Sequence, residues 1–547
     1  MSVATEAVYQ FAPEERPTFP GSPASPALSG WYRLGYAAIA LLIGATATFG
    51  NALITVNLSN LSGSMGVYVA QVSWLPAIFI AMNAGANLTL VKARAQFGIQ
   101  TVTNVLLGCY ALATLGQIAF PSFASAVVVR AICGMTAAGL TTLTIYHLLQ
   151  VFPGKLRPLA LVIGIGLIQL GTPLARLVPV EMLALNNWRG LHLIELGVAL
   201  AALAAMTALP LPAGERSKAF EPLDFVTIGL VLPALILLCG VLNEGRLLWW
   251  TDTPWLGWAL AASVALFTVA VLIERNRPRP LLQVHWFTTL DIARFAAIAL
   301  LVRIALAEQT YGAVGLLTSG GLTNDQLRIL FGFVLVAMFL GIVTAVLTLS
   351  EKKLPYQVMV AALVIALGAW IDTDATNVTR PPQLYLSQAL IGFGTTLFIG
   401  PALAYGILRV LRQGGDHLVS LIVLFSISQN VGGLAGSALL GTWQVASTHA
   451  HLQTLSERLV ATDPQVVERI QGGGVAVAGV VADPFLQGAQ GGALLVQSMT
   501  REANILAYNE VFRFVAILAL ATALYVAYVI VFHAVRRRRQ VIAGTQA

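Results

Sequence analysis

The sequence predicts an all-α polytopic membrane protein with fourteen transmembrane helices. Composition is the first reason: of 547 residues, 57% are hydrophobic and only 10% are charged, and the mean hydropathy is +0.80. A soluble protein of this size carries charge on about a quarter of its residues, so this chain lacks the polar side chains that a water-facing surface needs. The number of long apolar stretches and the placement of basic residues between them are the second and third reasons.

Each predicted helix is a stretch of mostly apolar residues near the length that spans a bilayer. About 20 such residues cross about 30 Å of hydrocarbon. The fourteen stretches are residues 34–58, 68–91, 99–119, 123–152, 158–180, 190–211, 224–243, 255–273, 291–317, 327–349, 356–372, 383–408, 417–443 and 511–534. Between them lie short loops and one long polar segment, 444–510.

Basic residues alternate from loop to loop. One side of the membrane carries Lys92 and Arg94, Lys155 and Arg157, Arg216 and Lys218, Arg275 to Arg279, Lys352 and Lys353, Arg409 and Arg412, and Arg536 to Arg539. The short loops on the other side carry only Arg189, Arg246 and Arg380. The positive-inside rule therefore places both termini in the cytoplasm and residues 444–510 outside. The net charge of +7 is mostly this orientation signal, so we expect no nucleic-acid partner.

The outer segment 444–510 contains signals for short helices. Residues 462–465, Thr-Asp-Pro-Gln, suit a helix start with a capping box and Pro464 at the first helical position. The three glycines at 472–474 are expected to end that helix in a flexible turn. Such a segment suits a lid or a docking surface for another protein, or a loop that only packs on the bundle.

Arg130 is the only charge between Pro121 and Gly154. An arginine inside a span almost always faces a bundle interior or a watery cavity. We expect it either to line a central pathway, where it holds an anionic group, or to form an ion pair that locks two helices together.

Glu308 and Arg303 lie in the ninth stretch, five residues apart. At about 100° per residue they point roughly 140° apart, so each needs a partner elsewhere. A carboxyl group at this depth could exchange a proton with a cavity, or form a static pair with an arginine of another span. His192 and Glu195 share a helix face near the outer surface, where solvation is the simpler expectation. Asp224 begins a span, where it suits a helix cap.

Motifs of soluble enzymes are absent from the sequence. It has no Walker loop, no His-Glu-x-x-His and no Gly-x-Ser-x-Gly, so we expect neither an enzyme nor a bound cofactor. His449 and His451 have no obvious further metal ligands, and the three cysteines lie in apolar runs that suit buried side chains. We therefore expect no metal site and no disulfide framework.

Three stretches resemble motifs of major facilitator transporters. Arg130 to Gly139 resembles the arginine motif of the fourth helix, residues 166–173 resemble the Gly-Pro antiporter motif, and Asn187-Trp-Arg189 resembles the opening of the sixth helix. The fourteen spans and residues 503–512 resemble the EmrB-like drug:proton antiporters, which have two extra central helices. The resemblance covers about residues 31–535 of the chain.

The resemblance implies a division of the chain into bundles. Residues 31–211 form the N-terminal six-helix bundle, 212–285 the two extra transmembrane helices, and 286–535 the C-terminal six-helix bundle, which includes 444–510 as a periplasmic segment. Residues 1–30 are expected to be a disordered cytoplasmic tail, and residues 536–547 a basic one.

Three departures from the family pattern bear on function. Gly50 stands where the family has an aspartate in its first helix, followed here by Asn51. The loop at 91–100, which ends with Gly98-Ile-Gln, lacks the usual Asp and Arg-Lys pair. Arg176 stands where the antiporter motif has glycine. These changes put the usual proton site and the usual gating ion pair in question.

The resemblance implies a secondary active transporter of the bacterial inner membrane that exports small drug-like, amphipathic or anionic compounds by alternating access, in exchange for protons. The residues expected to serve it fall into three groups. They are Glu308 and Arg130 for proton coupling; Asn51, Gln169, Arg303, Gln309, Ser426 and Asn430 for the substrate cavity; and Gly134, Gly139, Gly171, Pro173 and Gly98 for gating and packing.

Partners and alternatives also follow from the resemblance. It implies a HlyD-type periplasmic adaptor and an outer-membrane channel, contacted through 444–510. Because the usual acids are missing, a facilitator without proton coupling and an importer stay open, as does a membrane scaffold or sensor that has lost transport.

Overall fold

A computed structural model describes residues 22–544, except residues 25, 27, 153, 213–217, 278–279, 282, 288, 413–417 and 461. Every long element within these residues is a helix, and thirteen of the helices are long and apolar enough to cross a bilayer. The predicted all-α membrane fold is therefore confirmed. Residues 1–21 of the predicted N-terminal tail, and the last three residues of the basic tail, lie outside the described part of the chain.

The first six predicted spans form the N-terminal half. They are α1 (Gly30–Val56), α3 (Val69–Phe97), α4 (Ile99–Ala119), α5 (Phe123–Val151), α6 with α7 (Arg157–Ile168 and Gly171–Leu177) and α9 (Leu185–Ala208). Short helices occupy the connections, namely α2 (Leu58–Met65), η1 (Gly154–Leu156) and α8 (Val180–Leu183). Local signals explain the helix starts: the Ser122 side chain caps α5 by accepting from the backbone N–H of Ser125 at 3.1 Å.

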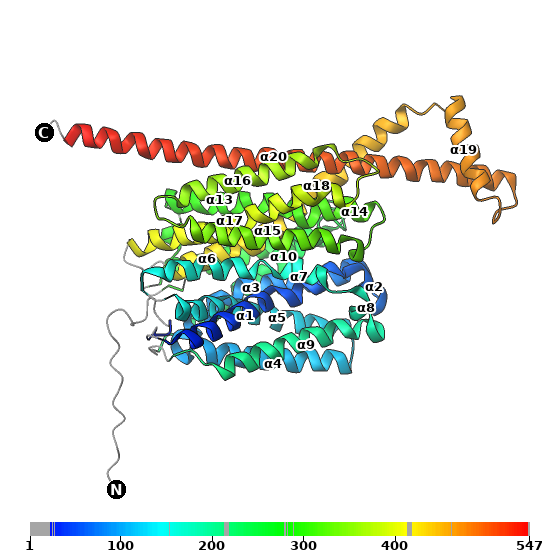
Figure 1. Ribbon diagram of the computed structural model, residues 1–547. Coiled ribbons are helices and arrows are strands. Elements are labelled where there is room, and N and C mark those ends of the chain that lie inside the picture. Colours follow the sequence, from blue (N-terminus) through cyan, green and yellow to red (C-terminus); the bar gives the residue numbers. More distant parts are fainter. Residues whose placement is uncertain are drawn as a thin grey trace, which may run out of the picture.

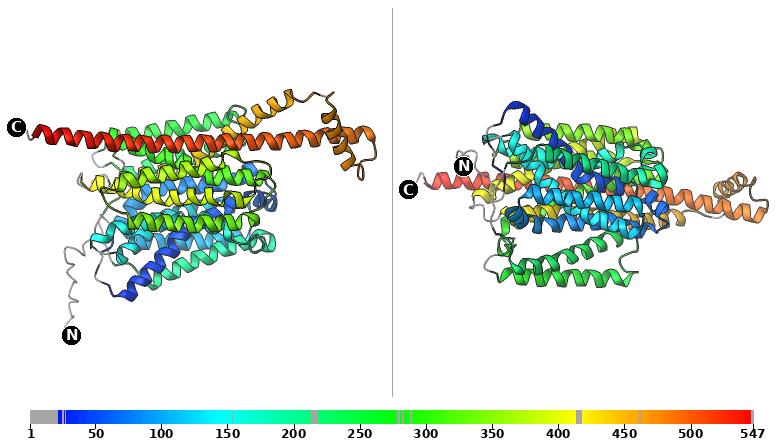
Figure 2. Two further views of the ribbon diagram at one scale, coloured as in Figure 1. Left: turned by 45° about the horizontal axis from the view of Figure 1, so that its top comes forward. Right: turned by 90° about the horizontal axis from the view of Figure 1, so that it is seen from below.

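Two added helices and the C-terminal half complete the bundle. The added helices are α10 (Pro222–Glu244) and α11 (Pro254–Arg275), followed by α12 (Val284–Phe287). The C-terminal half comprises α13 (Leu290–Ala305), η2 (Glu308–Ala313), α14 (Val314–Ser319), η3 (Asn324–Leu327), α15 (Arg328–Leu347), α16 (Leu354–Ile371), η4 (Asp372–Asp374), η5 (Pro381–Leu384), α17 (Tyr385–Arg412), α18 (Leu418–Glu457), α19 (Pro464–Ala476) and α20 (Pro484–Gly544). Helix α10 packs on α3 and on α11 at the side of the bundle (Figure 2).

The ninth predicted span is broken, which explains why thirteen long helices stand for fourteen predicted ones. Helix α13 ends at Ala305, a π-helical turn runs from Glu308 to Ala313, and α14 continues to Ser319. Each piece is shorter than a bilayer-crossing helix. Such π-turns occur often at functional sites, where they redirect a side chain.

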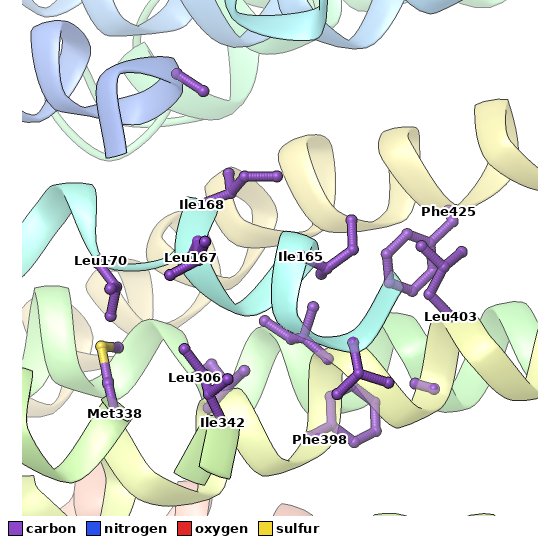
Figure 3. Packing of buried hydrophobic residues seen from close by; sticks show 14 of the residues in the cluster. Ile165, Leu167, Ile168, Leu170, Leu306, Met338, Ile342, Phe398, Leu403 and Phe425 are labelled. Carbon is purple, nitrogen blue, oxygen red and sulfur yellow. The ribbon is translucent and has the colours of Figure 1, made fainter. Parts of the chain in front are cut away.

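The two halves meet along α6, α15 and α17, with α3 against α18. Figure 3 shows this apolar contact from close by, with Ile165 and Ile168 of α6 opposite residues of α15, α17 and α18. At Gly400 of α17 an added Cβ would lie 2.9 Å from a side-chain atom of Val162 and 3.0 Å from its carbonyl oxygen, so these helices touch backbone to backbone.

A helical hairpin projects beyond one end of the bundle (Figure 1). Helix α18 is 40 residues long, α20 is 61 residues long, and both extend past the other helices, with α19 packed against α20. The start of α1 and the last turns of α20 lie at the opposite end of the bundle (Figure 1). The hairpin comprises the predicted outer segment 444–510.

Two expectations for the hairpin were wrong in detail. Helix α19 starts as predicted at Pro464, but its cap is Asp463, whose Oδ1 accepts from the N–H of Gln465 at 2.9 Å. The glycines at 472–474 do not form a turn, because α19 continues through them to Ala476. They allow close packing instead: a Cβ on Gly491 of α20 would lie 2.0 Å from the carbonyl oxygen of Ile470.

Candidate functional site

A cavity of about 200 Å³ lies between the two halves. One wall comes from α1, α3, α5 and α6, and the other from α13, α17 and α18. Its apolar lining consists of Ile145, Leu161, Ile165, Ile168, Ile399, Leu403, Ile407, Ile422 and Phe425. Figure 3 shows four of these, Ile165 and Ile168 on α6 and Leu403 and Phe425 on the helices of the other half.

The polar lining of the cavity carries positive charge. It consists of Thr48, Asn83, Asn87, Arg94, Thr141, Thr142, Tyr146, Gln169, Arg303, Ser426, Gln429 and Asn430. Two of these residues are arginines, and none of the described residues that line the cavity is acidic. The space thus combines a broad apolar surface, amide groups and two cations.

Neither cavity arginine pairs with a carboxylate of the described residues. Arg94, in the last turn of α3, donates from Nη1 to the hydroxyl of Tyr146 at 3.2 Å, while its Nε has no hydrogen-bond partner. Arg303 donates from Nε to the backbone oxygen of Gln429 at 2.8 Å. Both guanidinium groups therefore keep donors for an anion that enters the cavity.

The predicted cavity residues divide into two sets. Gln169, Arg303, Ser426 and Asn430 line the cavity. Asn51 and Gln309 do not; the Gln309 side chain donates instead to the backbone oxygen of Gln388 at 3.1 Å.

Eight polar lining residues were not predicted from the sequence: Thr48, Asn83, Asn87, Arg94, Thr141, Thr142, Tyr146 and Gln429. Asn83 and Asn87 are one helical turn apart inside an apolar span, and that spacing was a signal that could have found them. Asn87 also connects the halves, because its amide donates to Ser426 Oγ at 2.8 Å.

Arg130 lies in the interior of the N-terminal half and does not line the cavity. Its Nη2 is 2.5 Å from Oε1 of Glu195 on α9, and its Nη1 donates to the carbonyl of Gly50 at 3.1 Å. Tyr110 and His192 also bond to Glu195, at 3.0 and 3.2 Å. Of the two sequence-based interpretations, the ion pair that joins helices describes this arrangement.

His192 and Glu195 are not solvated, which corrects the expectation from sequence. Their exposed fractions are 6% and 2%, because α9 packs on α4 and α1. Glu195 also occupies the place of the missing acid of the first helix. A Cβ built on Gly50 would lie 2.8 Å from Glu195 Oε1, so the carboxylate from α9 fills the space that an aspartate at position 50 would need.

Glu308 is fully buried in the C-terminal half, outside the cavity. Gln388 of α17 donates from Nε2 to Glu308 Oε1 at 3.1 Å and to Asp372 Oδ2 at 2.9 Å. As the helical spacing predicts, Glu308 and Arg303 have different partners. Among the described residues no arginine pairs with Glu308, so the alternative of a static ion pair does not apply there.

A polar latch joins the halves at the hairpin end of the bundle. Asn324 of η3 accepts from Arg176 Nη1 at 2.7 Å and donates to the carbonyl of Val56 at 2.8 Å. The Arg176 guanidinium also lies 4.7 Å from the centre of the Phe331 ring. The arginine that departs from the antiporter motif is therefore part of the contact that closes this end.

The predicted packing residues lie at close helix contacts. A Cβ on Gly171 would lie 2.1 Å from Thr48 Oγ1, one on Gly134 would lie 2.5 Å from the carbonyl of Phe79, and one on Gly139 would lie 2.7 Å from Thr103 Oγ1. Pro173 is buried in α7. Gly98 has φ of +85° between α3 and α4, a conformation that favours glycine.

A charged cluster fixes the added helices at the end opposite the hairpin. Arg277 contacts Glu221, Asp224 and Glu274 at 2.8, 2.9 and 2.8 Å, and Lys92 of α3 reaches Asp224 at 2.5 Å. Asp224 also caps α10 by accepting from the N–H of Glu221, as expected. Among the described residues no group of three or more His, Cys, Asp or Glu side chains could hold a metal ion.

Comparisons with known proteins agree with this architecture. No family model matches the sequence. A triacylglyceride transporter of Mycolicibacterium smegmatis is 26% identical over 458 residues, which cover 77% of each chain. An uncharacterized MFS-type transporter of Bacillus subtilis, YvkA, is 23% identical over 244 residues, which cover 44% of this chain and 52% of the relative.

The structural similarity covers almost the whole chain. A bacterial homologue of the human drug peptide transporters PepT1 and PepT2 superimposes with a TM-score of 0.54 and 11% identity, over 92% of this chain and 99% of that protein. The chain therefore has the major facilitator fold, with thirteen helices among the described residues that are long and apolar enough to cross a membrane, and both of these sequence relatives are transporters.

Proposed function

We propose that the protein is a secondary active exporter of small anionic amphipathic compounds, which works by alternating access and takes up protons in exchange. The observation that carries the proposal is the charge of the cavity. Arg94 and Arg303 line it, and none of the described lining residues is a carboxylate. A cationic drug would meet like charge there, whereas an anionic headgroup would be held by guanidinium donors.

The apolar wall of the cavity supports an amphipathic substrate. Ile165, Ile168, Leu403 and Phe425 would cover an acyl or aromatic portion, while Asn87, Gln429 and Asn430 reach polar groups. The triacylglyceride transporter among the relatives handles a lipid, which agrees with a lipid-like substrate here.

Alternating access is supported by the unequal ends of the cavity. The latch of Arg176, Asn324 and Val56 holds the halves together at the hairpin end. Arg94 lies in the last turn of α3, so the cavity lining extends toward the end of the bundle opposite the hairpin. With the termini in the cytoplasm, as the basic loops indicate, the latch would lie at the outer end and hold it closed, as in an inward-facing state.

Proton coupling is assigned to the buried carboxyl group of Glu308. Because it has no cationic partner among the described residues, its charge can change during the cycle without the loss of an ion pair. Arg130 has the supporting role of fixing Glu195 and the first helix inside the N-terminal half.

The hairpin is proposed to dock a HlyD-type adaptor. Its exposed apolar residues include Val475, Val480, Phe485 and Val496, with exposed fractions of 72, 93, 81 and 55%. The hairpin that carries them projects beyond the bundle (Figure 1). Where such side chains form a contiguous patch outside the bilayer, the patch is a candidate protein contact. Shortening the hairpin within 460–490 should leave transport in vesicles intact and weaken export from a cell with two membranes; equal export from such cells would exclude the adaptor.

The function can be tested in vesicles that contain the purified full chain. A dansyl-labelled fatty acid serves as the anionic amphipathic probe, and ethidium as the cationic one. An imposed pH gradient should drive movement of the fatty acid, with matching proton flow in the opposite direction, and should not drive ethidium. Arg303→Gln should weaken binding of the fatty acid about ten- to a hundredfold, which corresponds to a charge-assisted hydrogen bond of about 1.5–3 kcal/mol.

Each alternative predicts a different result. Movement that ignores the pH gradient would identify a facilitator, and movement of ethidium alone would overturn the substrate class. Folded protein that moves neither probe would favour a scaffold or sensor. Arg380→Gln is the matched control, because Arg380 is exposed in the loop before α17 and its replacement should leave binding unchanged.

A further inference from the structure

Glu308 is one of two buried carboxyl groups that share a single donor. Asp372, the first residue of η4, is 2% exposed, and Glu308 is 0% exposed. The amide nitrogen of Gln388 lies between them, 3.1 Å from Glu308 Oε1 and 2.9 Å from Asp372 Oδ2. Three separate elements, η2, η4 and α17, therefore bring two carboxyl groups to one amide.

Nearby cations do not neutralise this pair. Arg303, on the helix before Glu308, is bonded to Gln429. Arg513 of α20 lies 3.8 Å from Asp374, the exposed neighbour two residues beyond Asp372. Two buried carboxylates without a cation would repel each other and lose their hydration, so the pair is stable only when it carries a proton.

An unsatisfied oxygen supports the same conclusion. Asp372 Oδ1 is buried and has no hydrogen-bond partner among the described residues. An ionised carboxylate in that position would leave an acceptor unused away from water, which is costly. A proton on this carboxyl group removes the negative charge that the free oxygen would otherwise carry.

We propose that Glu308 and Asp372 hold one proton between them, that Gln388 positions both carboxyl groups, and that this pair passes protons from the outer side during transport. When the proton moves from Asp372 to Glu308, the O–H bond of Asp372 breaks and an O–H bond forms on Glu308. The charge of the pair does not change in this step. The relay rests on the proposed function, whereas the shared proton does not.

The position of Asp372 suits the entry side of the relay. It lies where α16 ends near the hairpin end of the bundle, and Asp374, two residues later, has a side chain that is 90% exposed. Glu308 lies deeper, on the π-turn between α13 and α14. A metal cation fits less well than a proton, because the nitrogen of the Gln388 amide, a donor, faces both carboxyl groups.

The other titratable groups around the pair are engaged elsewhere. Tyr311 of η2 accepts from Arg246 at 2.8 Å and donates to Gln444 at 3.0 Å. Tyr508 of α20 lies against the Tyr311 ring, with ring centres 6.4 Å apart. Helix α20 contributes an apolar side chain beside Glu308, because Phe512 and the Glu308 Cγ both border Gly312.

The shared proton can be tested without any substrate. Infrared difference spectra of the purified full chain in detergent, at near-neutral pH, should contain the C=O stretching band of a protonated carboxyl group, which shifts in D₂O. Glu308→Gln and Asp372→Asn should each shift or remove this band, because the remaining carboxyl group no longer shares its proton with a second carboxylate. Glu510→Gln is the control, since Glu510 is paired with His451 and is only partly buried.

The outcomes separate the shared proton from the alternatives. If Asp372→Asn leaves the band unshifted, Glu308 holds the proton alone and the proposal is wrong. If neither change shifts or removes it, the pair holds no proton. Gln388→Met keeps both carboxyl groups and should shift the band, which covers the case in which a carboxyl variant fails to fold; an unshifted band would contradict the positioning role.

A transport measurement separates the relay from the proposed function. In vesicles, Asp372→Asn should retain exchange of the dansyl-labelled fatty acid and lose its accumulation under a pH gradient. A shifted or lost infrared band in both variants, together with no transport by the unaltered chain, would keep the shared proton and reject the transport proposal. Full coupled accumulation by Asp372→Asn would reject the relay alone.

Discussion

Arg130 and Glu195 form an ion pair at 2.5 Å between α5 and α9, with side-chain exposures of 1% and 0%. The pair also reaches α1 and α4, because Arg130 donates to the carbonyl of Gly50 and Tyr110 donates to Glu195. Four helices of the N-terminal half are thus held by one guanidinium group and one carboxylate. Such a pair contributes mainly through the cost of breaking it, since either partner alone would be an unpaired buried charge.

Removal of one partner should therefore destabilise the protein strongly. Arg130→Met should cost about 3–5 kcal/mol, the usual cost of an orphaned buried charge. The measurement is the temperature at which the detergent-solubilised chain loses its monodisperse elution peak. The double variant Arg130→Met with Glu195→Leu should recover most of the loss, and a double variant as unstable as the single one would show that the pair is not the cause.

The latch should set the relative populations of the inward-open and outward-open states. Asn324→Ala removes the partner of Arg176 and of the Val56 carbonyl. A hydrogen bond to a charged group contributes about 1.5–3 kcal/mol, so the outward-open population should rise about ten- to a hundredfold. Spin labels at exposed Tyr68 and Ser319, in a chain without the exposed Cys109, measure the change as a longer distance between the halves.

Asn377→Ala is the matched control for the latch. Asn377 donates to Glu502 at 2.6 Å, but both residues belong to the C-terminal half. Its replacement should leave the distance distribution unchanged. An equal shift in both variants would mean that general loosening, and not the latch, separates the halves.

The added helices should loosen when their central cation is removed. Arg277→Met leaves the carboxylates of Glu221, Asp224 and Glu274 with less compensation, so α10 and α11 should separate more often from α3. Cys239 reports this motion, because it is buried in α10. Its labelling by a maleimide should accelerate about tenfold or more, as a loss of about 1.4 kcal/mol would produce. Arg275→Met, at an exposed position two residues away, should label as slowly as the unaltered chain.

Gly171 should not tolerate a methyl group. A Cβ there would lie 2.1 Å from Thr48 Oγ1 and 2.9 Å from the backbone nitrogen of Phe49, so α7 would have to move away from α1. Overpacking of this kind costs about 1–3 kcal/mol. Gly171→Ala should lower the melting temperature, whereas Gly108→Ala, which meets nothing within 4 Å, should leave it equal or slightly higher.

The fold was predictable because the hydrocarbon of a bilayer permits few secondary structures for a chain that spans it. Composition and apolar length found the helices, and the broken ninth span was still recognised as one crossing. The π-turn at Glu308 was not predictable from local signals. It lies against a distant part of the chain, where Phe512 and Tyr508 of α20 fill the space beside Gly312 and Gly315. The glycines at 472–474 were misjudged for the same reason: their role depends on a partner helix.

The site was predictable only where a residue type is rare in membrane-spanning segments. Arg130, Arg303 and Glu308 stood out as charges in apolar runs, but their partners come from distant parts of the chain, so neither Glu195 nor Gln388 could be assigned to them. The stretch Gln388-Ala-Leu-Ile-Gly392 resembles Arg130-Ala-Ile-Cys-Gly134 in the first half of the chain. The partner of Glu308 therefore lies at the position that is internally equivalent to Arg130, with a neutral amide in place of a cation.

The length of helix α20 affects any protein that binds to its far end. Its 61 residues make a rod of roughly 90 Å, about three times the thickness of the hydrocarbon layer. The rod is seated on α13, α16 and α18, so it turns as one body with the C-terminal half. A small angular change near the membrane centre becomes a large sweep at the tip, and a protein bound there would sense the transport cycle as displacement.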